Sequence, residues 1–419
     1  MEKALLVTIK IESEKNNWPL EDTAYELEEL ASASGAEVIN NITCICDKPT
    51  ANFFIGSGKC EEIAFLCQAE NIDMVIFSHD LSGTQQRNLE EIIGCKTIDR
   101  TELILDIFAR QAKSPEGKMQ VELAQLEYLM PRLVGKGIML SRLGGGIGTR
   151  GPGEQKLEVD RRKIRKRIDR LKDDLKHLML HRQTLRKRRQ ENSIPAVALV
   201  GYTNAGKSTL LNALTDASQY VQDSLFTTLD PASKGMHLAN GEKIVISDTV
   251  GFLQNLPHNL IEAFKATLEE VVEADLLIHV LDVSHPAVYE HAAAVTAVLK
   301  ELGVSDKPRI TALNKIDLLD DKIWLAELSR VFPETVCVSA KLKHNLNELL
   351  NKIQLRFAQR MDSVEMLLPH SRMGLMDLFY REGRVEEAKY LAKGIKVKAT
   401  LPKIIVQKYL KDIEIKYID

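Results

Sequence analysis

The spacing of the apolar residues changes along the chain. Up to about residue 100, short apolar runs alternate with segments whose apolar positions have the helical period. The predicted strands are 3–10, 37–45, 74–77 and 95–98, and the predicted helices lie near 21–34, 59–70 and 84–93. Strands that alternate with helices are typical of a parallel sheet covered by helices. We therefore predict an α/β domain over residues 1–100.

Over residues 101–193 the pattern becomes helical, with two seams in which apolar positions recur at alternating spacings of four and three. The first such seam is Met119, Leu123, Leu126, Met130 and Leu133, and the second is Ile164, Ile168, Leu171, Leu175 and Leu178. Because heptad-like seams pack helices together, the two segments predict a long antiparallel helical hairpin. The glycine-rich stretch between them, with Arg142 and Arg150, is its predicted tip.

Strands and helices alternate again over 194–358, which predicts a second α/β domain. It includes an amphipathic helix at 259–274 whose predicted buried face is Ile261, Phe264, Leu268 and Val271. Residues 359–419 predict a small α+β domain, with extended segments near 365–368, 386–390 and 395–401, a helix near 373–381 and a last helix. The predicted fold class is therefore α/β with a helical hairpin and a C-terminal α+β unit.

One segment of the 194–358 region passes from an apolar run into glycine, lysine and a hydroxyl. The spacing Gly201-x4-Gly206-Lys207-Ser208 follows strand-like residues and precedes a helical pattern, which is the context of a phosphate-binding loop. Such a loop favours anions because backbone N–H groups converge at a helix N-terminus. We predict that Lys207 reaches the β- and γ-phosphates and that the Ser208 hydroxyl binds Mg²⁺. A glycine turn without a ligand is the alternative.

This loop does not distinguish ATP from GTP, so the choice depends on the segments that follow. The polar segment 225–231 contains Phe226 and Thr228, and Thr228 is placed to reach the metal and the γ-phosphate. The apolar run 244–248 ends in Asp248, which is placed to hold Mg²⁺ through water. Gly251 follows, and its backbone N–H can face the γ-phosphate.

Two further strand ends predict a guanine site. The Asp317 carboxylate, in Asn314-Lys315-Ile316-Asp317, can accept hydrogen bonds from both N1–H and the 2-amino group of guanine. Adenine offers neither donor, and a site built on such bonds can discriminate by roughly 10^4. In Ser339-Ala340-Lys341, the Ala340 N–H can donate to guanine O6. GTP or GDP is therefore the predicted nucleotide.

The predicted site residues fall into three groups: catalytic residues, metal ligands and nucleotide-binding residues. The predicted catalytic residues are Lys207, Thr228 and Gly251, and the predicted metal ligands are Ser208, Thr228 and Asp248. The predicted nucleotide-binding residues are Gly201, Tyr202, Thr203, Asn204, Ala205, Gly206, Lys207, Ser208, Thr209, Phe226, Thr228, Asp248, Gly251, Asn314, Lys315, Asp317, Ser339, Ala340 and Lys341.

These motifs, in this order, resemble the GTPase superfamily of translation-factor type, and the wider chain resembles the HflX family of ribosome-associated GTPases. The closer resemblance rests on segments 116–126, 144–154 and 157–162, and it weakens after about Gln359. It implies GTP hydrolysis, binding of the large ribosomal subunit and its rRNA through the N-terminal region, and a role in splitting or rescuing stalled ribosomes. It also implies a cytoplasmic, partly ribosome-associated protein.

Composition agrees with this picture. With 44% hydrophobic residues in 419, the chain is long enough for two or three domains with cores. It lacks an apolar run of membrane-spanning length and a secretory signal pattern, so we expect a cytoplasmic protein. We also expect a monomer off the ribosome. The six cysteines suggest reduced core thiols.

The charge is distributed unevenly along the chain. Residues 160–190 hold 14 Lys and Arg against 4 Asp, a net charge of +10. Because the net charge of the whole chain is −3, the remaining residues together carry −13.

One expected part of the hydrolytic site is missing. Phe252 occupies the place after Gly251 where many GTPases have a glutamine that orients water. We therefore predict slow intrinsic turnover that a large partner accelerates, by ~10^3–10^5 when such a site is completed.

Asn204 lies where some GTPases bind K⁺ as a substitute charge. The alternative is that its side-chain amide only braces the loop.

Two other functions remain open from the residues alone. The basic hairpin could serve a protein partner or an acidic membrane surface, which would make the chain a non-ribosomal GTPase switch. An ATP-driven RNA remodeller is the other possibility, and it conflicts with the guanine pattern at 314–317.

Overall fold

The computed structural model describes residues 2–13, 18–133, 152–191, 194–215, 225–226, 232–254, 265–319, 322–410 and 413–417. The chain forms two compact units. The first unit comprises 1–179, 222–230 and 255–266, and the second comprises 180–221, 231–254 and 267–419. Within the described ranges, no helix is both long and apolar enough to cross a membrane. The predicted domain boundaries near residues 100, 193 and 358 stay predictions.

The first unit contains a four-stranded parallel sheet with the order β2-β1-β3-β4. Its strands are β1 (Lys3–Ile11), β2 (Glu37–Cys46), β3 (Met74–Phe77) and β4 (Lys96–Asp99), and its helices are α1 (Leu20–Ala33), α2 (Ser57–Glu70) and α3 (Gly83–Ile93). Every predicted strand and helix of this region is present, with ends within two residues of those predicted. β1 and β3 are almost entirely buried, which is expected for a sheet covered on both faces.

A buried carboxylate connects this sheet to the helices that follow it, α4 (Arg100–Gln111) and α5 (Pro115–Arg132). Asp99 is fully buried at the end of β4. Its oxygens accept hydrogen bonds from the Leu81 and Glu102 N–H groups at 3.0 and 2.9 Å, and from the Tyr128 hydroxyl at 2.8 Å. Arg132 pairs with it at 2.8 Å. Burial raises the pKa of Asp99, while these bonds and the Arg132 charge oppose the rise. The network anchors α5 to the sheet.

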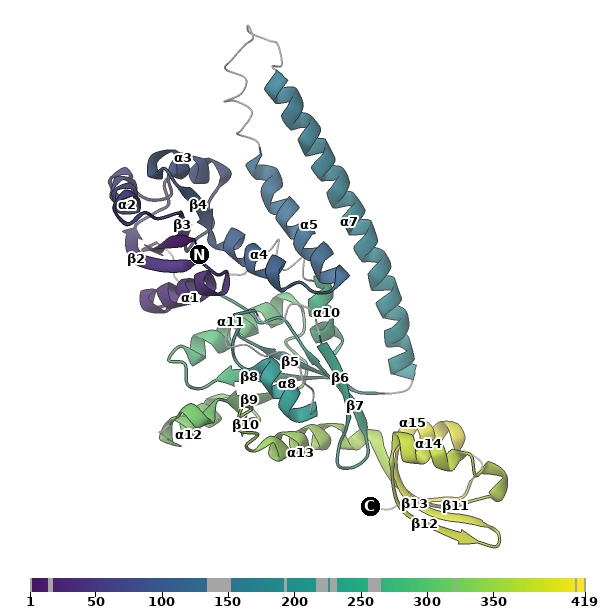
Figure 1. The fold of residues 1–419 in the computed structure, drawn as a ribbon. Helices are drawn as coiled ribbons and strands as arrows, with labels where there is room; N and C mark the ends of the chain where they lie inside the picture. The colour runs from purple at the N-terminus through teal and green to yellow at the C-terminus, as the bar shows by residue number, and fades with distance from the viewer. Residues whose placement is uncertain are drawn as a thin grey trace. The chain divides into compact units, whose positions relative to one another are not determined.

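The two predicted heptad seams pack against each other as α5 and α7 (Pro152–Glu191), whose facing stretches run side by side in Figure 1. Leu123, Ile168, Leu171 and Leu175 are buried between them, with Met119, Leu126, Met130 and Ile164 partly buried at the margin. The hairpin packing is therefore confirmed. Leu133 and Leu178, which end the predicted seams, lie outside this cluster. The predicted tip, including Arg142 and Arg150, lies outside the described residues.

The second unit contains a six-stranded sheet with the order β10-β9-β8-β5-β7-β6, in which only β6 is antiparallel to its neighbour. Its strands are β5 (Ala196–Gly201), β6 (Ala232–His237), β7 (Lys243–Asp248), β8 (Leu276–Asp282), β9 (Arg309–Asn314) and β10 (Thr335–Cys337). Its helices are α8 (Lys207–Thr215), α10 (Lys265–Glu273), α11 (Val288–Glu301), α12 (Lys322–Val331) and α13 (Leu346–Phe357).

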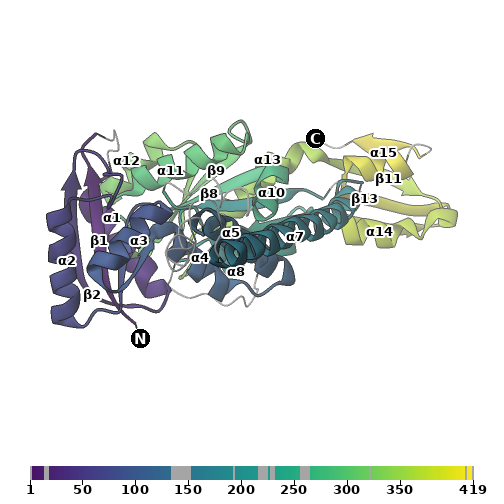
Figure 2. The ribbon, with the colours of Figure 1, turned by 90° about the horizontal axis from the view of Figure 1, so that it is seen from above.

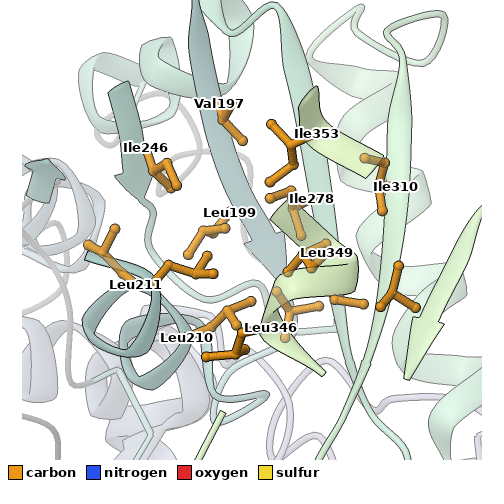
Figure 3. Packing of buried hydrophobic residues seen from close by; sticks show 14 of the residues in the cluster. Val197, Leu199, Leu210, Leu211, Ile246, Ile278, Ile310, Leu346, Leu349 and Ile353 are labelled. Atoms are coloured by element: carbon orange, nitrogen blue, oxygen red, sulfur yellow. The ribbon is translucent and has the colours of Figure 1, made fainter. Parts of the chain in front are cut away.

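One apolar core fixes the position of α8 against this sheet. In Figure 3, Leu210 and Leu211 of α8 and Leu346, Leu349 and Ile353 of α13 lie over the strand residues Val197, Leu199, Ile246, Ile278 and Ile310. Burial of this apolar surface holds the start of α8 at the end of β5. The predicted helix at 259–274 is described from Lys265, and its Leu268 and Val271 are buried as predicted, whereas Ile261 and Phe264 lie outside the described residues.

The C-terminal part of the second unit is an antiparallel sheet of order β12-β13-β11-β14. Its strands are β11 (Met361–Leu368), β12 (Arg384–Leu391), β13 (Gly394–Pro402) and β14 (Ile415–Tyr417). The helices α14 (Leu375–Glu382) and α15 (Lys403–Tyr409) share its apolar core, and Figure 2 shows both helices beside the strands. The predicted α+β character of this region is confirmed. Its β12 contacts the turn between β6 and β7, where Arg384 Nη1 donates to the Ala239 carbonyl at 2.9 Å.

Replacing Leu171 by Ala tests the helical hairpin. The Leu171 side chain is fully buried between α5 and α7, so Leu171→Ala should destabilise this packing by about 2–5 kcal/mol. We expect faster amide hydrogen exchange in α5 and in residues 160–179. The control is Leu129→Ala, because Leu129 is 45% exposed on α5 and its truncation should leave exchange unchanged. Equal exchange in both variants would contradict the proposed seam.

Candidate nucleotide-binding site

Most of the predicted nucleotide residues lie along one edge of the sheet in the second unit. β5 ends at Gly201, β7 at Asp248 and β9 at Asn314. These strands are parallel, so their carboxyl ends meet at the same edge. Ligands of open α/β sheets bind at this edge.

Glycine at two loop positions allows the 201–206 segment to pass very close to its neighbours. A Cβ atom on Gly201 would lie 2.4 Å from the carbonyl oxygen of Val280 in β8. Gly206 has a φ of +90°, and its Cβ would lie 2.3 Å from Nδ2 of Asn314. Helix α8 begins directly after it, at Lys207. The loop therefore ends in a helix N-terminus, which favours an anionic ligand.

Lys207 carries a buried positive charge inside this loop. It is 6% exposed, and its Nζ donates to the carbonyl oxygens of Gly201 at 3.1 Å and Tyr202 at 2.8 Å. Burial lowers the pKa of Lys207 to about 8, and the negative charge of Asp248 opposes this shift. An anion beside Nζ would stabilise the charged ammonium, because an opposite charge favours the ionised form.

Ser208 and Asp248 form a pair of oxygen ligands next to the lysine. Ser208 Oγ donates to Asp248 Oδ2 at 2.6 Å, and Asp248 is fully buried. Mg²⁺ prefers oxygen ligands and usually takes one or two from the protein, with phosphate and water oxygens completing the shell. The pair therefore fits a magnesium ion that a nucleotide helps to bind. Elsewhere in the described part of the chain, no group of three or more His, Cys, Asp or Glu side chains could hold a metal.

The segment after β7 is held against the phosphate loop by its backbone. The Thr203 N–H donates to the Phe252 carbonyl at 2.8 Å, and the Phe252 N–H donates to the Gly201 carbonyl at 3.1 Å. A Cβ on Gly251 would lie 2.7 Å from Thr203 Cα and 3.1 Å from Lys207 Nζ, so only glycine fits there. The Phe252 side chain is 1% exposed and packs in the core. Residue 252 therefore supplies no side-chain hydrogen bond to a water molecule.

Hydrogen bonds connect the residues predicted to recognise the base. Asn314 is 2% exposed, and its Nδ2 donates to the Ala205 carbonyl at 2.9 Å while its Oδ1 accepts from the Ala340 N–H at 3.0 Å. Ser339 Oγ donates to Asp317 Oδ1 at 2.5 Å. This arrangement fixes Asp317 and Ala340 at the same end of the site.

Three residues near the site were missed from the sequence. Asp282 pairs with Lys315 at 2.6 Å, and Val280 supplies the carbonyl that excludes a side chain at Gly201. Asp282 could have been found, because it ends an apolar strand as Asp248 does. His291 stacks on the ring of Tyr202 at 3.8 Å, and burial lowers its pKa to about 3, so the imidazole is neutral near pH 7. No sequence signal indicates this stack.

The remaining predicted residues are less informative. Asn204, with a φ of +59°, and Thr209 are half-buried in the loop and in α8, and Lys341 is exposed beside Ala340. Phe226 packs edge-on against Phe108 of α4, with ring centroids 4.5 Å apart, so its role in nucleotide binding stays a prediction. Thr228 lies outside the described residues.

Comparisons with known proteins identify the family. Residues 21–109 match a family model described as "GTP-binding GTPase N-terminal", and 111–189 match "GTP-binding GTPase Middle Region". Residues 196–315 match "50S ribosome-binding GTPase". A solved "SsGBP and GDP complex" aligns over 86% of this chain and 99% of its own, at 27% identity and a TM-score of 0.48.

Sequence relatives cover nearly the whole chain. A protein named GTPase HflX from Caldanaerobacter subterraneus subsp. tengcongensis is 49% identical over 398 residues, which are 95% of this chain and 90% of that protein. The GTPase HflX of Escherichia coli is 42% identical over 92% of this chain and 90% of its own length. Both relatives are named as GTPases. The chain therefore belongs to the HflX family of GTPases, and it is a GTP hydrolase.

Proposed function

We propose that this GTPase binds GTP with Mg²⁺ at the 201–208 loop and hydrolyses it in response to the large ribosomal subunit. Lys207 and the loop N–H groups would hold the β- and γ-phosphates, and the Gly251 N–H would face the γ-phosphate. Ser208, Thr228 and Asp248 would hold the metal. Bound Mg²⁺ would bridge the β- and γ-oxygens and neutralise their charge.

Guanine would be read at the other end of the site. Asp317 would accept from N1–H and the 2-amino group, and the Ala340 N–H would donate to O6. The support is that Asp317 and Ala340 are already held by hydrogen bonds from or to Ser339 and Asn314. A site that is ordered in advance loses little entropy when it binds its ligand.

The observation that carries the proposed ribosome dependence is the buried ring of Phe252, which is 1% exposed. The usual side chain that orients the attacking water is missing at this position, and the ring cannot turn outward without leaving the core. A GTPase of this kind needs its site completed by a partner, an effect that can be worth ~10^3–10^5 in rate. We propose that the ribosome is that partner.

The charge on α7 supports an RNA partner. Among its described side chains, Arg162, Arg165, Lys166, Arg170 and Lys176 are exposed. These cations outnumber Asp169 and Asp173, which are exposed on the same side of the helix, so the exposed side of α7 has a net positive charge. A surface of this kind binds phosphate backbones with an affinity that falls as salt rises. We propose that this side of α7 and the 142–153 tip contact rRNA of the large subunit.

The cellular role follows from the family and the proposed partner. We propose that the protein splits or rescues stalled ribosomes, that it is cytoplasmic and partly ribosome-associated, and that it is a monomer when free. GTP would order the segments around Thr228 and Gly251, and hydrolysis would then release the subunit.

The test is steady-state GTP hydrolysis with and without purified large ribosomal subunits. We expect strong stimulation of the intact protein. A variant whose 142–153 segment is replaced by a short neutral loop should lose the stimulation and keep its nucleotide affinity. A variant with Arg165→Gln, Lys166→Gln and Arg170→Gln should bind subunits more weakly.

A matched control removes three lysines from the C-terminal sheet, with Lys389→Gln, Lys396→Gln and Lys398→Gln. Each of these lysines forms an ion pair with a neighbouring glutamate. The control therefore removes the same number of positive charges as the α7 variant, but from a surface where glutamates already balance them. Stimulation should survive in this control. Absence of stimulation in the intact protein would reject the ribosome and favour a GTPase switch with a protein or membrane partner.

We also propose K⁺ as an additional cation at Asn204. Its left-handed backbone, with a φ of +59°, turns the loop at the position where such an ion would lie beside the phosphates. We expect faster GTP hydrolysis in K⁺ than in Na⁺ at equal ionic strength, and an Asn204→Ala variant should lose this difference. Equal rates of the intact protein in both salts would reject the idea.

A further inference from the structure

We propose that, in the site as the partner completes it, the Thr203 hydroxyl supplies one hydrogen bond to the attacking water, a bond that the Phe252 side chain cannot supply. Thr203 would thus be a catalytic residue of the GTPase reaction. The inference rests on the proposed binding of the γ-phosphate between Lys207 and Gly251.

Thr203 lies at the γ-phosphate end of the site. The point where a Cβ on Gly251 would stand is 2.8 Å from Cγ2 of Thr203, its methyl carbon, and 3.1 Å from Lys207 Nζ. The Thr203 methyl group, the Gly251 backbone and the lysine ammonium therefore lie around one small volume. The hydroxyl is bonded to the same Cβ as this methyl group, so a change of the χ1 rotamer would bring Oγ1 into that volume. Of these three, Lys207 and Gly251 are the groups assigned to the γ-phosphate.

The hydroxyl of Thr203 is buried and has no protein partner. Thr203 is 6% exposed, and its Oγ1 makes no hydrogen bond to any described residue. Its backbone N–H is already used by the Phe252 carbonyl at 2.8 Å. A buried hydroxyl without a partner costs about 1–3 kcal/mol, and valine would fill the same volume without that cost. A ligand that supplies the missing partner explains why a hydroxyl is tolerated here.

A threonine hydroxyl can accept one hydrogen bond and donate another. It can therefore accept from the attacking water and donate to a γ-phosphate oxygen at the same time. The water oxygen forms a bond to the γ-phosphorus, and the bond from phosphorus to the β,γ-bridging oxygen breaks with its electron pair on GDP. The protons of the water leave to phosphate oxygens, and the products are GDP and inorganic phosphate. Thr203 is unchanged.

The test compares Thr203→Val, Thr203→Ala and Thr203→Ser in single-turnover GTP hydrolysis. Valine keeps the volume and removes the hydroxyl, alanine removes it without adding bulk, and serine retains it. We expect Val and Ala to slow the chemical step by roughly 10²-fold, as the loss of one transition-state hydrogen bond does in other enzymes. The Ser variant should stay within a few-fold of the intact protein. GDP affinity should change little in all three, because the proposed hydrogen bonds go only to the water and to the γ-phosphate, which GDP lacks.

A second readout separates this role from a structural one. Binding of GDP with aluminium fluoride, which imitates the transition state, should weaken in the Val and Ala variants while GDP binding alone does not. Thr296→Val is the control, because the Thr296 hydroxyl donates a hydrogen bond to the Ala292 carbonyl within α11 at 2.8 Å. Intact rates in Val and Ala, or a parallel loss of GDP affinity, would overturn the proposal. If the intact protein itself did not bind or hydrolyse GTP, the proposed nucleotide site at the 201–208 loop would be rejected, rather than the role of Thr203 alone.

Discussion

The side chain of Asn314 joins three segments that are far apart in the sequence. Its Nδ2 donates to the Ala205 carbonyl in the phosphate loop, and its Oδ1 accepts from the Ala340 N–H after β10. Asn314 is 2% exposed, so both hydrogen bonds are shielded from water. Loss of either bond would leave a buried polar group without a partner, which costs free energy of folding. The same Nδ2 lies where a side chain on Gly206 would stand. One buried amide thus joins the phosphate end of the candidate site to its base end, and β9, which carries this amide, belongs to the sheet whose apolar core Figure 3 shows.

The hydrolytic end is held differently from the base end. Backbone hydrogen bonds join Phe252 to Gly201 and Thr203, and the Phe252 ring is sealed in the core. This fixes the main chain of Gly251 beside Lys207 but leaves the usual water-orienting side chain missing. The candidate site therefore holds the Gly251 main chain near the lysine but has no side chain at residue 252 that could orient water. If the proposed function holds, the nucleotide would stay bound until a partner completes the transition state.

Much of this architecture could be predicted from the sequence, for physical reasons that differ between regions. The strands around Met74–Phe77 and the seam at Leu171 follow from apolar periodicity, because burial of one face dictates that periodicity. The positions of Lys207 and Asp317 follow from motifs whose spacing the chemistry requires. The stack of His291 on Tyr202 and the packing of Phe226 on Phe108 could not be predicted, because each joins segments distant in the sequence through tertiary contacts alone. The lack of a hydrogen-bond partner for Thr203 Oγ1 could not be predicted either, because the sequence places Thr203 in a loop but does not show which polar atoms of that loop form hydrogen bonds.

The measurement that tests this account most directly is the equilibrium affinity of an Asn314→Ala variant for GDP, determined by titration calorimetry. The truncation leaves the Ala205 carbonyl and the Ala340 N–H without their buried partner, so GDP should bind roughly 10²-fold more weakly. The control is Asn88→Ala in the first unit, which removes an exposed amide that bonds to the Asn52 carbonyl and should leave GDP affinity unchanged. Circular dichroism should show both variants folded. Wild-type GDP affinity in folded Asn314→Ala would contradict the central role assigned to this amide.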